Sequence, residues 1–333
     1  MIVQAQIASP KVYVLTIKGT INPVLVDYVG RGIDQAERDN AQVVIIQMDT
    51  PGGLDTAMRD IIQKIVSSRV PVVVYVAPSG ARAASAGVYI TLSAHVAVMA
   101  PNTAIGAATP VQLGAEGVQQ TPDEMKRKII NDAVAYIRSL AESHGRNAEW
   151  AEKAVRDGVS ITEQEALKLK VIDLISPDLN TLIPQLNGKQ VKMLDGRLVT
   201  LQTQNAIVSS VVMRAIEKFL YTIADPNIAF ILLSIAALGI TVEIFNPGLI
   251  FPGVIGAICG VLAFYALGQL PVNIAGILLI ALAIIFFIAE ALTATFGILL
   301  TGGIVSLIIG SLILFQGGSP VFRVDPWLIA IVT

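Results

Sequence analysis

The C-terminal third of the chain is almost free of charge, and this constrains the fold more than any other feature. Residues 226–320 contain two charged side chains, Glu243 and Glu290. An apolar run of about 20 residues is long enough to cross a bilayer as a helix. Four such runs can be placed, at 228–245, 249–268, 272–292 and 297–315. We therefore expect a transmembrane domain over 226–333, with four to five spans if the apolar segment 326–333 begins another.

The four expected spans are joined by very short connections and show a weak internal repeat. GLIFPG at 248–253 resembles GILLTG at 297–302, and each follows a glutamate that closes the preceding run. This suggests two helix–turn–helix units. Small residues allow close helix packing in membranes, and candidates are Gly256, Gly260, Gly302 and Gly303. Glu243 and Glu290 either snorkel to the interface from helix ends or mark a proton or ion path.

Residues 1–222 have an ordinary globular composition in which strand-like and helix-like segments alternate. Strands are expected at 12–18, 43–48, 70–76, 96–99 and 171–176, and helices at 22–40, 54–68, 85–94, 123–144, 147–156 and 162–169. Continuous apolar strands alternating with helices are typical of an α/β core with a parallel sheet. We expect this domain to occupy 1–205, with a loop and a small strand pair over 177–205. An amphipathic helix over 207–221, within a linker at 206–225, is expected to lie at the membrane interface.

Charge and cysteine content exclude several function classes. The net charge is −2, so there is no basic patch to favour a nucleic-acid partner. The chain has one cysteine, Cys259, and two histidines, which makes a His/Cys metal site very difficult to build. We therefore expect no metal and no cofactor.

The two ends of the chain carry little targeting information. Residues 1–19 lack the basic region and apolar core of a signal peptide. The short loops between the spans carry almost no Lys or Arg, so the positive-inside rule gives no orientation. Because 326–333 resembles the first two turns of an apolar helix, we expect the natural protein to continue.

Two segments of the soluble half carry the candidate chemistry. Ser85 lies among small residues at an expected helix start, in ARAASAGVYITLSAH at 81–95. Upstream, the Gly52–Gly53 turn in DTPGG follows a buried strand and could supply backbone N–H groups. A serine beside such N–H groups is the pattern of a nucleophile next to an oxyanion hole. The alternatives are close helix packing for Ser85 and a tight strand-to-helix connection for the glycines.

A serine nucleophile needs a base, and neither histidine is well placed. His95 lies at the far end of the helix that Ser85 starts, and His144 lies in a polar context that suggests exposure. A lysine can act as the base when burial favours its neutral amine. Lys126 and Lys128 both precede an apolar helix, and helical spacing does not choose between them. Arg138 is excluded as a base, because guanidinium does not deprotonate in proteins.

Five sequence blocks, in order, resemble the long form of the NfeD family. They are DTPGG, ASAGVYITLSAHVAVMAP, NTAIGAATPV, KIINDAVAYIRSLAESHGRNAEWAEKAV and SITEQEALKLKVIDLI. Members of this family are membrane-bound serine proteases of the ClpP/crotonase superfamily, related to signal peptide peptidase A. The resemblance implies a ClpP/crotonase-like α/β domain followed by a helical membrane domain. Family members often end in a cytosolic OB-fold domain, which we expect to be absent or truncated here.

The resemblance also implies residue roles. The serine of the ASAG block falls on Ser85 as nucleophile, and the lysine that opens the next helix falls on Lys128 as general base. The family's Pro-Gly-Gly turn falls on Pro51, Gly52 and Gly53. Together with the residue pattern this predicts a Ser/Lys endopeptidase, in which the N–H groups of Gly52 or Gly53 and of Ala86 hold the oxyanion.

Substrate and partners follow from the same resemblance. It implies cleavage of apolar segments, such as the hydrophobic C-terminal region of a stomatin/prohibitin-like (SPFH) membrane protein. It also implies a homo-oligomer in the plasma (inner) membrane, with the protease domain on the extracytoplasmic side. Three other classes remain open: a scaffold for an SPFH protein with little turnover, a channel or transporter using Glu243 and Glu290, and a crotonase-like acyl-CoA enzyme.

Overall fold

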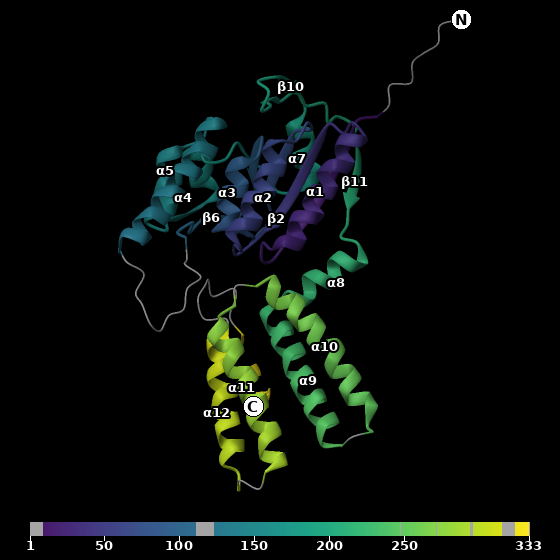
Figure 1. Ribbon diagram of the computed structural model, residues 1–333. Helices are drawn as coiled ribbons and strands as arrows, with labels where there is room; N and C mark the ends of the chain where they lie inside the picture. The colour runs from purple at the N-terminus through teal and green to yellow at the C-terminus, as the bar shows by residue number, and fades with distance from the viewer. Residues whose placement is uncertain are drawn as a thin grey trace, which may run out of the picture. The chain divides into compact units, whose positions relative to one another are not determined.

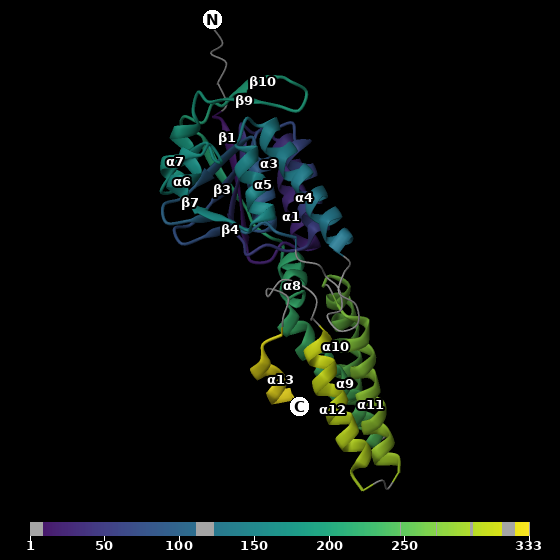
Figure 2. The same cartoon turned by 90° about the vertical axis from the view of Figure 1, so that its left-hand side faces the viewer.

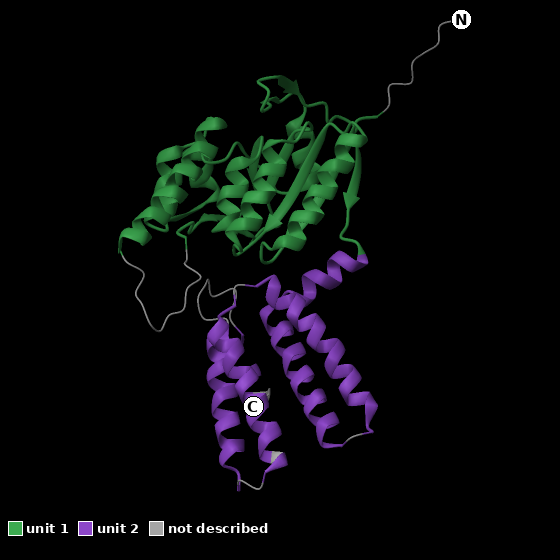
Figure 3. Cartoon of the chain, viewed as in Figure 1, with its two compact units in different colours: residues 1–110, 121–214 green, residues 111–120, 215–333 purple. Residues whose placement is uncertain are grey.

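The computed structural model describes residues 9–110, 123–246, 248–270, 272–293, 296–314 and 324–332 (Figure 1). These residues form two compact units, and the chain passes from unit 1 to unit 2 between Arg214 and Ala215 (Figure 3).

Unit 1 is built on a six-stranded sheet with the order β11-β1-β2-β3-β5-β8, in which every neighbouring pair is parallel. The strands are β1 (Lys11–Lys18), β2 (Val43–Asp49), β3 (Val72–Val76), β5 (Val96–Met99), β8 (Leu174–Ile175) and β11 (Ile207–Val211). The central strands are apolar along almost their whole length, because helices cover both faces of the sheet. The predicted α/β core with a parallel sheet is confirmed.

Seven helices and two small sheets complete the described part of unit 1. The helices are α1 (Pro23–Arg38), α2 (Asp55–Val66), α3 (Ala86–Ser93), α4 (Asp123–Ser143), α5 (Ala148–Arg156), α6 (Glu163–Lys168) and α7 (Leu179–Leu186). A three-stranded sheet joins β4 (Arg82–Ala84), β6 (Ala104–Gly106) and β7 (Ser160–Thr162), and β9 (Gln190–Lys192) pairs with β10 (Leu198–Thr200).

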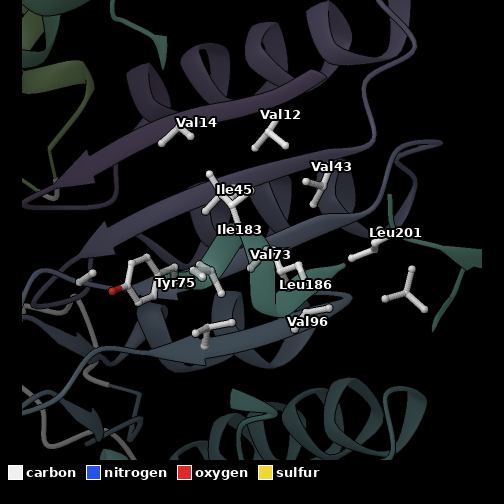
Figure 4. Close-up of a cluster of buried hydrophobic side chains, with 14 of the residues drawn as sticks. Val12, Val14, Val43, Ile45, Val73, Tyr75, Val96, Ile183, Leu186 and Leu201 are labelled. Atoms are coloured by element: carbon white, nitrogen blue, oxygen red, sulfur yellow. The ribbon is translucent and has the colours of Figure 1, made fainter. Parts of the chain in front are cut away.

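The two faces of the main sheet are covered by different helices (Figure 2). On one face, alternate residues of the central strands pack against Leu182, Ile183 and Leu186 of α7 (Figure 4). On the other face, α1 lies so close to β1 that a Cβ on Gly32 would come within 2.4 Å of the Leu15 side chain. The layered core therefore fixes the carboxyl ends of β2 and β3, where ligands commonly bind in α/β sheets.

Two expectations for residues 177–225 were wrong. The expected loop contains helix α7, whose N-cap Asp178 accepts a hydrogen bond from the Thr181 N–H at 2.8 Å. The expected amphipathic helix from residue 207 begins instead with strand β11, which pairs in parallel with β1. The Tyr28 hydroxyl donates to the Val211 carbonyl oxygen at 2.6 Å, so tertiary contacts decide the conformation here. The helix of this segment, α8, spans Ala215–Ile223.

In unit 2, α8 is followed by apolar helices that match the four expected spans in position. They are α9 (Pro226–Phe245), α10 (Ile250–Gly268), α11 (Ile274–Leu292) and α12 (Ile298–Leu314), and the short α13 spans Pro326–Val332. Helices α9 and α10, with 20 and 19 residues, are long and apolar enough to cross a membrane. The apolar stretches Ile274–Glu290 and Ile298–Leu314 are shorter, so two spans are clear among the described residues.

Close packing at glycines holds each helical hairpin of unit 2 together. A Cβ on Gly256 of α10 would lie 2.9 Å from the backbone nitrogen of Ile240 in α9, and one on Gly303 of α12 would lie 2.4 Å from the Phe287 ring in α11. The predicted close approach of small residues is therefore confirmed at these two glycines.

Glu290 has a role that differs from both sequence predictions, which were snorkelling to the interface and a proton or ion path. Its carboxylate accepts hydrogen bonds from the N–H groups of Gly297 at 2.7 Å, Leu299 at 3.1 Å and Leu300 at 3.2 Å. These are groups at the start of α12 that have no partner within the helix. Glu290 therefore caps the second helix of its hairpin.

Candidate active site

The Gly52–Gly53 turn lies directly after β2 and has a conformation that requires glycine. Gly52 has φ +116°, and a Cβ on Gly53 would lie 2.1 Å from the Ile21 carbonyl oxygen. The buried Thr50 hydroxyl accepts a hydrogen bond from the Gly52 N–H at 3.0 Å, so this N–H is already engaged. The Gly53 N–H, by contrast, has no hydrogen-bond acceptor within the described residues.

Ser85 lies at a sharp turn between strand β4 and helix α3. Its backbone has φ +51° and ψ −115°, an unfavourable conformation for a residue with a Cβ. The Ser85 N–H donates to the Gly106 carbonyl oxygen at 3.1 Å, and the Ser85 carbonyl accepts from the Val88 N–H at 3.0 Å. A strained strand–serine–helix turn presents the serine Oγ, as in the nucleophile elbow of hydrolases.

The glycine turn and Ser85 are in contact, as the sequence predicts. A Cβ on Gly52 would lie 2.7 Å from the Ser85 Cβ and 3.1 Å from its Oγ. Gly87, the second residue of α3, approaches Thr50 so closely that a Cβ there would lie 2.7 Å from the Thr50 Cγ2. The small residues around Ser85 thus serve close packing and bring Ser85 against the turn at the same time.

Ala86 is the first residue of α3, which directly follows Ser85. The first N–H groups of a helix lack intrahelical partners and carry the positive end of its dipole. Between residues 9 and 110, the Ala86 N–H has no hydrogen-bond acceptor. Gly53 and Ala86 therefore offer two unengaged backbone donors on the elements that flank Ser85.

Lys128 is exposed and forms no hydrogen bond with Ser85 among the described residues. It lies in the second turn of α4, and Lys126 lies at the end of the first turn with a side chain that is also exposed. In the described ranges, no hydrogen bond joins the Ser85 Oγ to a base. Catalytic hydrogen bonds are often long or absent without substrate, so this geometry leaves Lys128 eligible.

The two histidines are paired with each other, well away from Ser85. His95 follows α3 and is ten residues from Ser85, roughly 15 Å along a helix. Its ring packs edge-on against His144 with 6.0 Å between the centroids, so the expected exposure of His144 was wrong. Burial, reinforced by His144 and Arg146, lowers the pKa of His95 to about 4, and burial lowers the pKa of His144 too. His95 and His144 thus have a structural role.

A cluster around Arg59 joins helices α2, α3 and α4, and the sequence analysis did not identify it. Arg59 of α2 donates to Asp55 at 2.8 Å and to Asp132 of α4 at 2.9 Å. Its guanidinium lies 4.4 Å from the ring centroid of Tyr136, and that ring stacks on Tyr89 of α3 at 6.0 Å. The Asp55–Arg59 spacing of four residues was the available signal, since such pairs face each other on a helix.

The tyrosines of this cluster are unsuited to act as the base. Burial raises the pKa of Tyr89 well above its usual range, and burial raises the pKa of Tyr136 against the opposing effect of Arg59. Both phenols are therefore protonated near neutral pH.

No group of three His, Cys, Asp or Glu side chains in the described residues could hold a metal ion.

Known proteins match both halves of the chain. Residues 11–211 match the NfeD1b N-terminal domain, and residues 227–333 match the NfeD integral membrane domain. The membrane-bound protease PH1510 of Pyrococcus horikoshii is 43% identical over 326 residues, which are 96% of this chain and 73% of that protein.

Solved structures of a protease domain resemble unit 1. A lysine-to-alanine variant of the 1510-N membrane-bound stomatin-specific protease, in complex with a substrate peptide, is 42% identical with a TM-score of 0.60. The match covers 65% of this chain and 98% of that one. A serine-to-alanine variant is 43% identical with a TM-score of 0.58, covering 62% of this chain and 100% of that one. With its soluble and membrane regions both matched, this chain belongs to the NfeD family.

Proposed function

We propose that this protein is a membrane-anchored serine endopeptidase in which Ser85 is the nucleophile and Lys128 the general base. The observation that carries the proposal is the positive φ of Ser85 at a strand–helix turn, directly against the Gly52–Gly53 turn. Backbone strain of this kind is concentrated at functional sites. The homologous protease, which has been studied as serine-to-alanine and lysine-to-alanine variants, supports the same pair of residue types.

In the proposed reaction the neutral Lys128 amine takes the proton from the Ser85 hydroxyl as Oγ attacks the peptide carbonyl carbon. The carbonyl π electrons move to oxygen, and the resulting oxyanion is held by the N–H groups of Gly53 and Ala86. Collapse of this intermediate breaks the C–N bond, and Lys128 returns its proton to the leaving amine. Water then hydrolyses the acyl-enzyme by the same route.

The sequence predicts that the N–H group of either Gly52 or Gly53 binds the oxyanion, and the hydrogen bonds of the turn favour one of the two. Because Thr50 already accepts from the Gly52 N–H, we assign the donor role to Gly53 and a space-making role to Gly52. Removing one oxyanion donor typically lowers the rate about 100- to 1000-fold.

The relatives and unit 2 support a proposal for the substrate and the setting. The homologous domain is named as specific for stomatin, so we propose an apolar C-terminal segment of a stomatin-like (SPFH) partner as substrate. We further propose four to five membrane spans, a homo-oligomeric assembly, and a protease domain on the extracytoplasmic side of the plasma membrane. A scaffold with little turnover is the second candidate, favoured by the absence of a hydrogen bond between Lys128 and Ser85 in the described residues.

The test is cleavage of an apolar peptide from a stomatin-like protein by the wild type and by Ser85→Ala, Lys128→Ala and Lys126→Ala. We expect Ser85→Ala to lose about 10⁴-fold or more in kcat, as for other serine hydrolases, and Lys128→Ala to lose most activity. Lys126→Ala, the matched control, should be close to wild type. Equal cleavage by the wild type and Ser85→Ala would refute the proposal, whereas swapped lysine results would transfer the base to Lys126.

A further inference from the structure

We propose that Arg59 is a positioning residue that holds helix α4, and with it Lys128, in register with the Ser85 turn. This inference rests on the proposed function, since it assigns Arg59 to the Ser/Lys pair. Three independent contacts of one guanidinium carry it: to Asp55 of α2, to Asp132 of α4, and to the ring of Tyr136.

Each contact leads to a different part of the site. Asp55 is the first residue of α2 and follows the Gly52–Gly53 turn after one residue. Asp132 lies four residues after Lys128 on α4, so the two side chains occupy the same side of that helix. Arg59 therefore ties the α4 surface that carries Lys128 to the beginning of α2.

The third contact connects α4 to the helix that Ser85 precedes. Tyr136, a further turn along the same side of α4, stacks on Tyr89 with 26° between the ring planes. Tyr89 is buried, and lies four residues after Ser85 on the turn and helix that present the nucleophile. Arg59 covers the face of Tyr136, and so fixes α4 sideways as well as along its axis.

The chemistry of arginine suits this role. A planar guanidinium can donate in several fixed directions and stack on an aromatic face at once, whereas a lysine ammonium cannot. The Asp55, Arg59 and Asp132 side chains are substantially exposed, and exposed ion pairs contribute little to stability. The value of the cluster therefore lies in geometry, because a displacement of about 1 Å at a reacting group can cost about 100-fold in rate.

The experiment compares full-length variants in detergent or liposomes: Arg59→Ala, Arg59→Lys, Asp132→Asn and the control Arg69→Ala. Arg69 also forms a surface ion pair, with Glu37 at 3.0 Å, on the same domain. The readouts are kcat and KM with the apolar peptide, the labelling rate of Ser85 by a fluorophosphonate, and the thermal midpoint.

We expect Arg59→Ala to lower kcat and the labelling rate about 10- to 100-fold, with KM little changed and a midpoint within about 3 °C of the wild type. Asp132→Asn should show a smaller loss, Arg59→Lys a partial recovery, and Arg69→Ala none. A purely structural role predicts instead that activity falls only as the midpoint falls, and that result would overturn the inference.

A second comparison separates action through Lys128 from any other route. In a Lys128→Ala background, adding Arg59→Ala should leave the slow labelling rate unchanged, because the positioned group is gone. A further fall would contradict a role through Lys128. If Ser85→Ala cleaved like the wild type, the proposed function would fail. If Ser85→Ala and Lys128→Ala were inactive while Arg59→Ala was fully active, only the positioning role would be overturned.

Discussion

Gly52 and Ser85 touch each other, and both have a positive φ, so each limits what the other can be. Ser85 keeps its strained backbone because Gly106 and Val88 hydrogen-bond its peptide groups and Gly52 leaves room for its side chain. At the residue scale the site therefore depends on the Cβ that Gly52 lacks as much as on the Ser85 side chain.

Gly52→Ala tests this space requirement. The added Cβ would lie 2.7 Å from the Ser85 Cβ, in a backbone with φ +116°. We expect about 1–2 kcal/mol of destabilisation from the positive φ and an activity loss of about 100-fold from displacing Oγ. Gly80→Ala is the matched control, because Gly80 has φ +86° and open space at its Cβ position. Equal activity losses in the two variants would show that contact with Ser85 is unimportant.

The buried His95 should make the stability of the folded protein depend on pH. Its Nδ1 accepts a hydrogen bond from the Val72 N–H at 3.1 Å, which requires a neutral ring. Because burial and neighbouring charges lower the pKa in the folded state to about 4 from 6.5, the folded protein binds fewer protons than the unfolded one. Stability should therefore be full above about pH 6.5 and decline towards pH 4, by up to about 3 kcal/mol.

The measurement is the thermal midpoint of the wild type and of His95→Gln between pH 4 and pH 8. Glutamine retains an acceptor but does not titrate, so its midpoint should vary much less with pH. His144, whose pKa is lowered in the same direction, should account for a remaining slope. An unchanged slope in His95→Gln would exclude His95 as the titrating group.

At the scale of elements, β11 extends the sheet through contacts made by α1. The Tyr28 hydroxyl accepts from the Thr16 N–H at 3.0 Å and donates to the Val211 carbonyl oxygen at 2.6 Å. Arg31 donates to the Val212 carbonyl oxygen at 2.9 Å. The last strand of unit 1 is thus anchored from the helix that covers β1.

Tyr28→Phe should loosen β11. It leaves two backbone groups without their partner, which costs about 1–3 kcal/mol for buried groups. Hydrogen exchange of residues 207–211 should become faster. Tyr75→Phe is the control, since the Tyr75 hydroxyl donates to the Ser176 carbonyl oxygen at 2.8 Å, outside β11. If both variants altered β11 equally, the anchor would lie elsewhere.

The Glu290 carboxylate stabilises another element, because it caps the N-terminus of α12. Glu290→Ala should cost about 0.5–2 kcal/mol, as for other N-cap losses, and speed hydrogen exchange at the start of α12. Glu290→Gln, which keeps one carbonyl oxygen, should cost less. A channel role predicts instead that Glu290→Gln abolishes ion flux through the liposome membrane. Flux in the wild type that Glu290→Gln removed would contradict the structural role.

The elements that could be predicted from the sequence are those whose residue pattern matches their burial. The strands β2, β3 and β5 are continuous apolar runs because both sheet faces are covered. Strand β11 could not be predicted, since Ile207 and Val208 are exposed and pairing with β1 decides its conformation. Helix α7 is short and contains Pro184, which reads as a break in a helical pattern.

The contact between the Gly52–Gly53 turn and Ser85 could be predicted from the sequence, whereas the other contacts of the candidate site could not. Gly52, Gly53 and Ser85 stand out by composition, and the resemblance supplied Lys128. The hydrogen bond from Gly52 to Thr50, which favours Gly53 as the oxyanion donor, depends on tertiary geometry. Arg59 carries no motif, because its partners Asp132 and Tyr136 are more than 70 residues away in the chain.

At the scale of the whole molecule, each of the two units accounts for a different part of the proposed activity. Unit 1 contains Ser85, the glycine turn, α4 and the Arg59 cluster, so the proposed chemistry is complete within one unit. Unit 2 contains helices α9 and α10, which are long enough to span a membrane. An apolar substrate segment and a membrane-anchored protease would meet at the same bilayer, which suits a membrane protein as partner.

The most direct test of the central claim is to treat the full-length protein in liposomes with a fluorophosphonate and to locate the adduct by mass spectrometry. The reagent forms a phosphorus–oxygen bond to an activated serine and releases fluoride. The proposed function predicts one adduct, on Ser85, formed much more slowly in Lys128→Ala and at an unchanged rate in Lys126→Ala. Labelling of a different serine, or labelling of Ser85 that is indifferent to Lys128, would contradict it.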